Sequence, residues 1–314
     1  MSFDREKAMQ YWNEQRVKAL TANKPWFIKP PHDVDLLFAL DLMGRSGEIN
    51  HAQVKKISQV NHMIQLLQPQ IMDLCLRLKM VRIVDAGCGS SFLSLSLAWL
   101  LKNRWEIQFQ LLGIDSNPKV VEKSRSRARI LGLEGNTQWE TTTIEQKIKQ
   151  LQDQRVIQNQ TSERFHVVLA LHACDTATDQ ALTLGLQESS DLVAVVPCCH
   201  RELAQIWKKN EALSKAHPLR LALKNPQIRN ELATHFTDAL RMGFMRHHGY
   251  EVTSTEFVSS EHTPKNRLLL CERRGLFHKP SLEEFEDSKK YLGSPALAFE
   301  RLYAETIGTR VKES

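Results

Sequence analysis

Hydrophobic spacing divides the chain into a helical first part and an alternating second part. Residues 4–20 and 51–78 carry apolar side chains at helical spacing. In the second of these segments one stripe collects Val54, Ile57, Val60, Met63, Ile64 and Leu67. Between the two segments, "KPWFIKPP" is a proline-punctuated connector. Residues 1–79 are therefore predicted to form an N-terminal helical extension.

From Met80 onward, short apolar runs alternate with helical segments. The pattern predicts strands over 81–87, 107–115, 137–143, 165–173 and 191–199, with helices over 90–103, 118–131 and 176–187. A mostly helical stretch to about residue 248, two closing strands over 250–258 and 267–273, and a helix over 281–293 complete the pattern. The alternation predicts a doubly wound α/β sheet in a domain over 80–275, followed by a C-terminal helical tail over 276–314.

Composition limits the class of protein. A chain of 314 residues with 42% apolar content can bury a sizeable core, and no apolar run is long enough to cross a membrane. The first residues lack an apolar signal region, and the six cysteines show no disulfide framework. We therefore expect a cytoplasmic protein with reduced thiols and no membrane association.

The segment "IVDAGCGSSF" (83–92) is the first chemical motif. A strand ending in an acid, followed by Gly-x-Gly and a helix, is typical of a turn whose backbone approaches a ligand closely. Phe92 stands where the dinucleotide fingerprint has its third glycine, which argues against a diphosphate. In "LLGIDSNP", Asp115 ends the next strand, where a carboxylate can accept both hydroxyls of a ribose. The two motifs predict an adenosine-type ligand.

In its "VDAGCG" and "GIDSNP" motifs and its strand order, the chain resembles the class I S-adenosylmethionine-dependent methyltransferases over residues 80–275. The resemblance implies a Rossmann-like seven-stranded methyltransferase sheet and S-adenosylmethionine as cofactor. It also implies that acid and glycines cradle the methionine part, that Asp115 holds the ribose and that the third strand's end lies beside the adenine. The cofactor residues it implies are Asp85, Gly87, Cys88, Gly89, Asp115, Ser116, Thr142 and His172.

Two further motifs follow the fourth and fifth predicted strands. In "LALHACDTATD" (169–179) and "VPCCHRE" (196–202), polar side chains leave the sheet at the edge where ligands bind in this architecture. We interpret Asp175 or His200 as the base or orienting group for the methyl acceptor, with Cys174, Cys198, Cys199 and Arg201 in the substrate-pocket wall. Thr176 and Asp179 also fit a helix capping box. Zinc is an alternative, but adjacent cysteines seldom point the same way and Cys-x-x-Cys is absent, so no metal is expected.

The same two motifs resemble a subgroup that includes the eukaryotic tRNA 2′-O-ribose methyltransferases of the acceptor stem. It also includes the methyltransferase-like half of a glutathione S-transferase C-terminal-domain protein. Here Asp175 stands where that subgroup usually has glycine, and the zinc modules of the tRNA enzymes are missing. In "SSEHTPKNRLLL" (259–270), His262, Lys265 and Asn266 are further candidate substrate contacts, or else a solvated hairpin. Lys56 or Lys265 could join Asp175 in ribose methylation.

Charge along the chain points to the substrate. The net charge is +6, and residues 200–229 hold seven Lys/Arg against two acids, with Arg241, Arg246, His247 and His248 beyond. A positive surface suits a phosphate backbone, so RNA is the expected substrate, although a solvated helix face is an equal alternative. Trp12 and Trp26 belong either to an RNA surface or to a cover for the sheet. Methylation of a small molecule or protein side chain, and cofactor binding without catalysis, remain alternatives; the sequence does not predict the oligomeric state.

Overall fold

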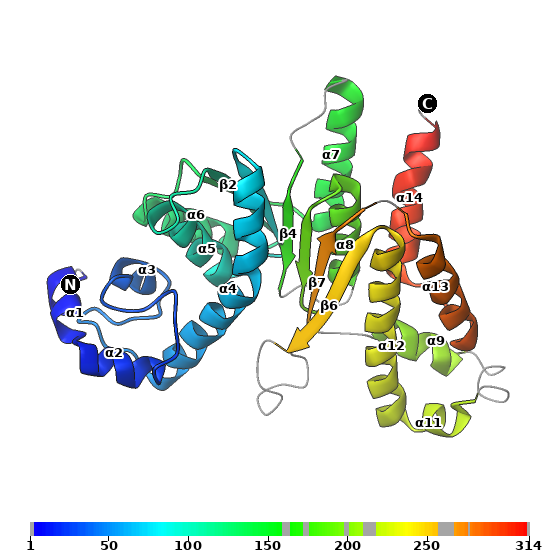
Figure 1. Cartoon of the computed structure of the whole chain (residues 1–314), viewed down its shortest axis with the longest axis horizontal. Coiled ribbons are helices and arrows are strands. Elements are labelled where there is room, and N and C mark those ends of the chain that lie inside the picture. Colours follow the sequence, from blue (N-terminus) through cyan, green and yellow to red (C-terminus); the bar gives the residue numbers. More distant parts are fainter. Residues whose placement is uncertain are drawn as a thin grey trace. The chain divides into compact units, whose positions relative to one another are not determined.

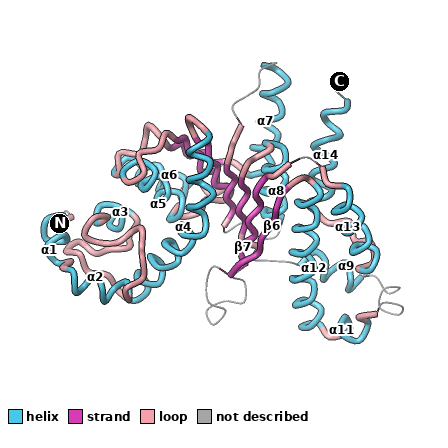
Figure 2. Tube along the Cα trace, in the orientation of Figure 1, coloured by secondary structure: helices cyan, strands magenta, loops and turns pink. Residues whose placement is uncertain are grey.

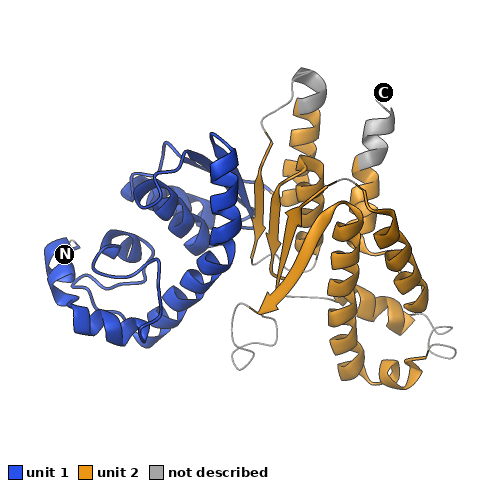
Figure 3. Cartoon of the chain, in the orientation of Figure 1, with its two compact units in different colours: residues 1–142 blue, residues 143–314 orange. Residues whose placement is uncertain are grey.

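The structure is a computed structural model with two compact units, residues 1–142 and 143–314 (Figure 3). It describes residues 3–158, 164–171, 176–197, 201–209, 218–256, 267–275 and 277–312.

Four helices precede the sheet in the first unit: α1 (Arg5–Tyr11), α2 (Glu14–Thr21), α3 (Val34–Ala39) and α4 (His51–Arg77) (Figure 1). Of the stripe predicted on α4, all members are buried except the half-buried Val54. The helical pattern over 4–20 contains a break, because Asn13 starts α2 by accepting a hydrogen bond from the Arg16 backbone.

The two tryptophans of the extension are core residues. Trp12 is 9% exposed and donates its indole N–H to the Gly47 carbonyl at 2.7 Å, and Trp26 is 7% exposed. The buried Asn61 amide of α4 bonds both the N–H and the carbonyl of Ile28, which fixes the connector against the helix. These indoles therefore belong to the packing of the extension and are closed to stacking on RNA bases.

Seven strands form one sheet in the order β3-β2-β1-β4-β5-β7-β6, and Figure 2 draws strands in magenta. The strands are β1 (Val81–Ala86), β2 (Phe109–Asp115), β3 (Thr137–Thr141), β4 (Val167–Ala170), β5 (Leu192–Val195), β6 (Tyr250–Glu256) and β7 (Arg267–Arg273). The β1–β2, β2–β3 and β4–β5 pairs are parallel, whereas β7 pairs antiparallel with β5 and β6. This topology confirms the predicted Rossmann-like seven-stranded methyltransferase sheet.

Helices α5 (Phe92–Asn103) and α6 (Pro118–Ile130) follow β1 and β2, as predicted. Strand register aligns the polar ends of the first unit's strands, because Asp85 lies across from Gly113 and Asp115 across from Thr141. The side chains that end these strands therefore lie along one edge of the sheet.

The second unit contains α7 (Ile144–Gln158), α8 (Thr176–Glu188), α9 (Arg201–Lys209), α11 (Arg220–Lys224), α12 (Pro226–His247), α13 (Lys279–Tyr291) and α14 (Ala298–Lys312). Helix α7 was not predicted, whereas α14 lies within the predicted C-terminal helical tail. Trp207, Phe244, Phe285 and Phe299 form the centre of an apolar core among α9, α12, α13 and α14. Within the described part of the chain, no helix has both the length and the apolar character needed to cross a membrane.

Candidate functional site

The turn after β1 is built from left-handed backbone. Gly87, Gly89 and Ser91 have φ angles of +77°, +50° and +53°, a region that glycine enters without steric cost. The backbone N–H groups of Gly87 and Cys88 both donate to the carbonyl of Ile114 at 2.9 Å. The turn, residues 87–91 and hereafter the cofactor loop, is thereby fastened to the end of β2.

Asp115 connects the ends of three strands. One of its carboxylate oxygens accepts the Gly89 N–H at 2.9 Å, and the other accepts the Asn117 N–H at 2.8 Å. Its backbone carbonyl accepts the Thr142 N–H at 3.1 Å. The structure therefore brings the predicted cofactor residues on β1, β2 and β3 into one constellation. Ser116 beside them is exposed and Thr142 is buried.

Asp85 is a buried acid at the end of β1. It is 5% exposed, and the Ser94 hydroxyl of α5 donates to its carboxylate. Burial raises the pKa of Asp85 to about 6; the Ser94 hydrogen bond opposes this rise, and repulsion from Asp115 adds to it. A cationic ligand group would favour the ionised form, so the site suits an ammonium such as that of a bound amino acid.

The backbone of the cofactor loop borders open space at Gly89, whereas the neighbouring strand is tightly packed at Gly113. A Cβ placed on Gly89 would meet no atom within 4 Å, whereas one on Gly113 would lie 2.3 Å from the Trp139 ring and 3.3 Å from the Cys88 sulfur. The Cys88 thiol is buried, which raises its pKa to about 12. Its sulfur therefore packs in the interior, and the loop presents backbone and Gly89 to a ligand.

Residues that the sequence analysis missed support the loop from behind. Arg127 of α6, 4% exposed, donates to the Ser90 carbonyl at 2.8 Å, and its guanidinium lies 5.4 Å from the centre of the Phe92 ring. The Ser91 and Ser124 hydroxyls are hydrogen-bonded at 2.7 Å. Only the tertiary fold brings α6 to the loop, so no local pattern signalled these contacts.

Lys56 lies close to the cofactor loop. The sequence offers this lysine as a candidate for catalysis of ribose methylation. Its ammonium nitrogen is 4.9 Å from the centre of the Phe92 ring. Desolvation lowers the pKa of this half-buried lysine. The extension therefore contributes one cation to the surroundings of the cofactor loop.

Most predicted substrate-side residues lie outside the described residues: His172, Cys174, Asp175, Cys198, Cys199, His200, His262, Lys265 and Asn266. Arg201 is described and begins α9 as an exposed residue. Over the described ranges, no group of three His, Cys, Asp or Glu side chains could hold a metal ion. Cys75, Cys88 and Cys271, which lie in those ranges, are free thiols.

A buried ion network in the second unit corrects two expectations. The sequence predicts a capping box of Thr176 and Asp179, but Thr176 lies inside α8 and not before it. Asp179 instead accepts the Nε–H of Arg241 at 2.7 Å, and both side chains are almost fully buried. Arg241 also pairs with Asp238, which in turn accepts a hydrogen bond from Arg267 at 2.7 Å. Arg241 is therefore a structural cation and adds nothing to a positive surface.

His247 and His248, which follow Arg241 at the end of α12, also do not belong to the predicted positive surface. His247 is buried, and burial lowers the pKa of His248 to about 4, so His248 is neutral at physiological pH. Their rings pack with Phe277, and His248 also packs with Phe244 and Tyr303. The positive charge predicted beyond residue 229 is thus reduced to Arg246, which is exposed.

Comparison with known proteins identifies the domain. Residues 55–206 match the family model of a methyltransferase domain, a match that begins inside α4. No curated protein sequence matches the chain. The match confirms the predicted enzyme class over these residues, which hold a methyltransferase domain.

Solved structures of low identity resemble the chain. The O-methyltransferase TomG from Streptomyces achromogenes, involved in tomaymycin synthesis and solved with S-adenosylmethionine, is 15% identical, with 85% of this chain and 99% of that chain covered and a TM-score of 0.47. An O-methyltransferase from Bacillus cereus is 13% identical, with coverages of 85% and 100% and a TM-score of 0.45. The methyltransferase PaMTH1 of Podospora anserina is 11% identical, with coverages of 84% and 97% and a TM-score of 0.46.

Proposed function

We propose that the chain methylates RNA. The supporting observation is the charge on α9, α11 and the start of α12, hereafter the basic segment: Arg201, Lys208, Lys209, Arg220, Lys224 and Arg229. All six are exposed except Arg229, which is half-buried. Glu202, the acid described among them, is already engaged, because it pairs with Arg301 at 2.7 Å and accepts the Ala298 N–H at 2.9 Å. The segment thus presents a surplus of cations, as phosphate binding requires.

The same observation favours RNA over a small molecule. A basic segment that packed inward would have left a closed pocket for a small substrate. Here the apolar face of α9, formed by Leu203, Ala204 and Trp207, packs inward, and Lys208 and Lys209 stay exposed. The predicted cytoplasmic location accords with an RNA substrate.

We assign the cofactor contacts residue by residue. Asp85 and the backbone of Gly87 and Gly89 bind the methionine part, and Asp115 binds the ribose. Each Asp115 oxygen accepts one backbone N–H, and a carboxylate has about four acceptor positions, so capacity remains for ribose hydroxyls. Thr142 lies beside the adenine.

When bound, S-adenosylmethionine supplies a methyl group on a positively charged sulfur, and the chain's contribution is to align the acceptor with it. Asp175 or His200 would accept the acceptor's proton where it has one of high pKa.

The test is transfer of labelled methyl groups from S-adenosylmethionine into total RNA, protein and small-molecule extract from cells lacking the gene. We expect label in RNA. The double variant Lys208→Glu/Lys209→Glu should lose most of that label while retaining cofactor binding, and Lys149→Glu, an exposed lysine of α7, is the matched control. Label confined to another fraction would contradict the RNA proposal, and binding of cofactor with no label anywhere would favour a non-catalytic binding protein.

A further inference from the structure

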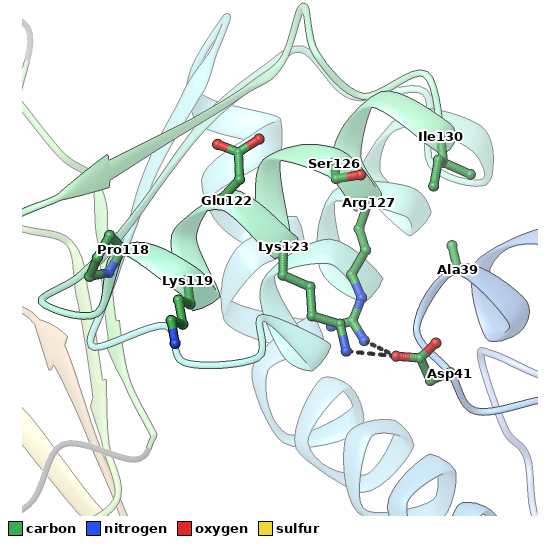
Figure 4. A pocket seen from close by; sticks show the side chains of 9 residues that line it. All are labelled: Ala39, Asp41, Pro118, Lys119, Glu122, Lys123, Ser126, Arg127 and Ile130. Atoms are coloured by element: carbon green, nitrogen blue, oxygen red, sulfur yellow. Dashed lines mark hydrogen bonds and ion pairs between the residues drawn. The ribbon is translucent and has the colours of Figure 1, made fainter.

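A pocket of about 710 Å³ lies in the first unit between residues 39–41 and one face of α6 (Figure 4). Lys119, Lys123 and Arg127 line it at spacings of four residues, so one helix face presents all three. Ser126 adds a hydroxyl group to the lining. The pocket is therefore cationic and able to donate hydrogen bonds.

The acids in the lining leave an excess of positive charge. Glu122 pairs with Arg125, which is not part of the lining. Asp41 accepts hydrogen bonds from Lys123 at 2.8 Å and from Arg127 at 2.7 Å, through the same oxygen (Figure 4). Neither acid of the lining pairs with Lys119, for which the described part of the chain shows no ion pair.

Asp41 is an exposed anion bound by a buried cation. Its side chain is 67% exposed, whereas that of Arg127 is 4% exposed. Asp41 also has a φ angle of +58°, a left-handed conformation that few residues other than Gly, Asn and Asp adopt readily. The Nε of Arg127 is buried without a partner in the described structure. The solvent-exposed Asp41 carboxylate thus occupies a position in which another anion could bind Lys123 and Arg127 in its place.

Arg127 links this pocket to the cofactor loop, since it also donates to the Ser90 carbonyl. A substrate group held here would therefore lie on the helix that supports the loop. Phosphate fits the donor set, because lysine and arginine donate strong, charge-assisted hydrogen bonds to its oxygens.

We propose that this pocket binds a backbone phosphate of the RNA substrate through Lys119 and Lys123, with Asp41 as the competing anion; the proposal rests on the proposed function. Arg127 keeps its contact with Ser90 and adds positive potential. This site is a phosphate contact of the first unit, in addition to those proposed for the basic segment.

The first experiment measures binding of a short fluorescent RNA oligonucleotide of mixed sequence by anisotropy, at several salt concentrations between about 50 and 200 mM. Lys119→Glu should weaken binding and lower the slope of log affinity against log salt by about 0.7 for one lost single-strand phosphate contact. Lys79→Glu is the matched control, because Lys79 is exposed just before β1, at the opposite end of that strand from the cofactor loop. A Lys119→Glu slope equal to that of the control would overturn the proposal.

The second experiment uses Asp41→Asn, since asparagine tolerates the left-handed conformation and removes only the charge. If Asp41 competes with phosphate, this variant should bind the oligonucleotide about fivefold more tightly, as expected for loss of the exposed Lys123–Asp41 ion pair. If Asp41 serves only to hold the extension on α6, affinity should stay the same or fall, and either result would refute competition. Thermal unfolding of each variant shows whether the fold is retained.

Methylation assays separate the two proposals. Wild-type protein that methylates RNA, with Lys119→Glu binding and methylating RNA as well as wild type, would refute the pocket and leave the proposed function intact. Wild-type protein that transfers no label to RNA would refute the proposed function itself, and with it the RNA phosphate.

Discussion

Replacing Asp85 with asparagine should stabilise the fold while weakening cofactor binding. The pKa of Asp85 is about 6 in the folded chain, against an ordinary value of 3.8, and burial is the main cause. A difference of about two, at ~1.4 kcal/mol for each, places the cost of folding with this carboxylate ionised at about 3 kcal/mol near neutral pH. Asparagine keeps an acceptor for the Ser94 hydroxyl and carries no charge.

The sign follows from proton binding. Between the two pKa values the folded state binds more protons at Asp85 than the unfolded state, so this group makes stability fall as pH rises, and the loss is complete above pH 6. At about pH 4.5 the cost is roughly 1 kcal/mol, and at about pH 7.5 it is roughly 3 kcal/mol. The gain from Asp85→Asn should therefore grow by about 2 kcal/mol over that range.

Urea unfolding of wild type and variant at both pH values, without cofactor, measures this difference. Asp73→Asn is the control, because Asp73 is an exposed acid paired with Arg77 and should change stability by less than ~1 kcal/mol. Cofactor affinity by calorimetry should fall in Asp85→Asn, and in wild type it should fall as pH drops below 6, since the ligand's ammonium binds the ionised acid. A variant less stable than wild type at pH 7.5, or a gain independent of pH, would refute the reasoning.

Two further substitutions test the packing around the sites. Gly113→Ala places a Cβ 2.3 Å from the Trp139 ring and should cost about 1–3 kcal/mol in unfolding free energy, whereas Gly135→Ala, with no atom within 4 Å, should be close to neutral. Arg241→Met leaves Asp179 buried without its cation and should cost about 3–5 kcal/mol by urea unfolding, which a loss below 1 kcal/mol would contradict.

Periodicity predicted the sheet because each of its strands has a local signature. The two closing strands and the helices after β1 and β2 also follow their patterns. Helix α7 is missing from the sequence prediction, although its apolar residues Ile144, Ile148 and Leu151 recur at helical spacing and are buried. Glutamines and charges dilute that stripe. The Thr143–Gln146 capping box that begins the helix is a signal that the sequence does carry, as Thr-x-x-Gln.

The cofactor loop was predictable for a related reason. Asp85, the glycines and Asp115 stand at strand ends, and parallel strands bring such ends to one edge whatever the details of packing. The role of Arg127 had no such signal, because its contact with Ser90 joins residues 37 positions apart. Sequence order thus indicates which residues can meet at a sheet edge but not which side chains support them.

Charge is the property that sequence reports least well, because a formal charge and a surface charge differ. Arg241 counts as a cation in the sequence, yet burial between two carboxylates cancels its effect on any ligand. His248 loses its charge to burial, and Arg127 is hidden but still pairs with an exposed acid. Lys208 and Lys119 remain exposed cations, on different helices and in different units. An RNA-binding surface inferred from composition alone would have included the wrong residues, and these two lysines are the ones whose reversal should change the salt dependence of RNA binding.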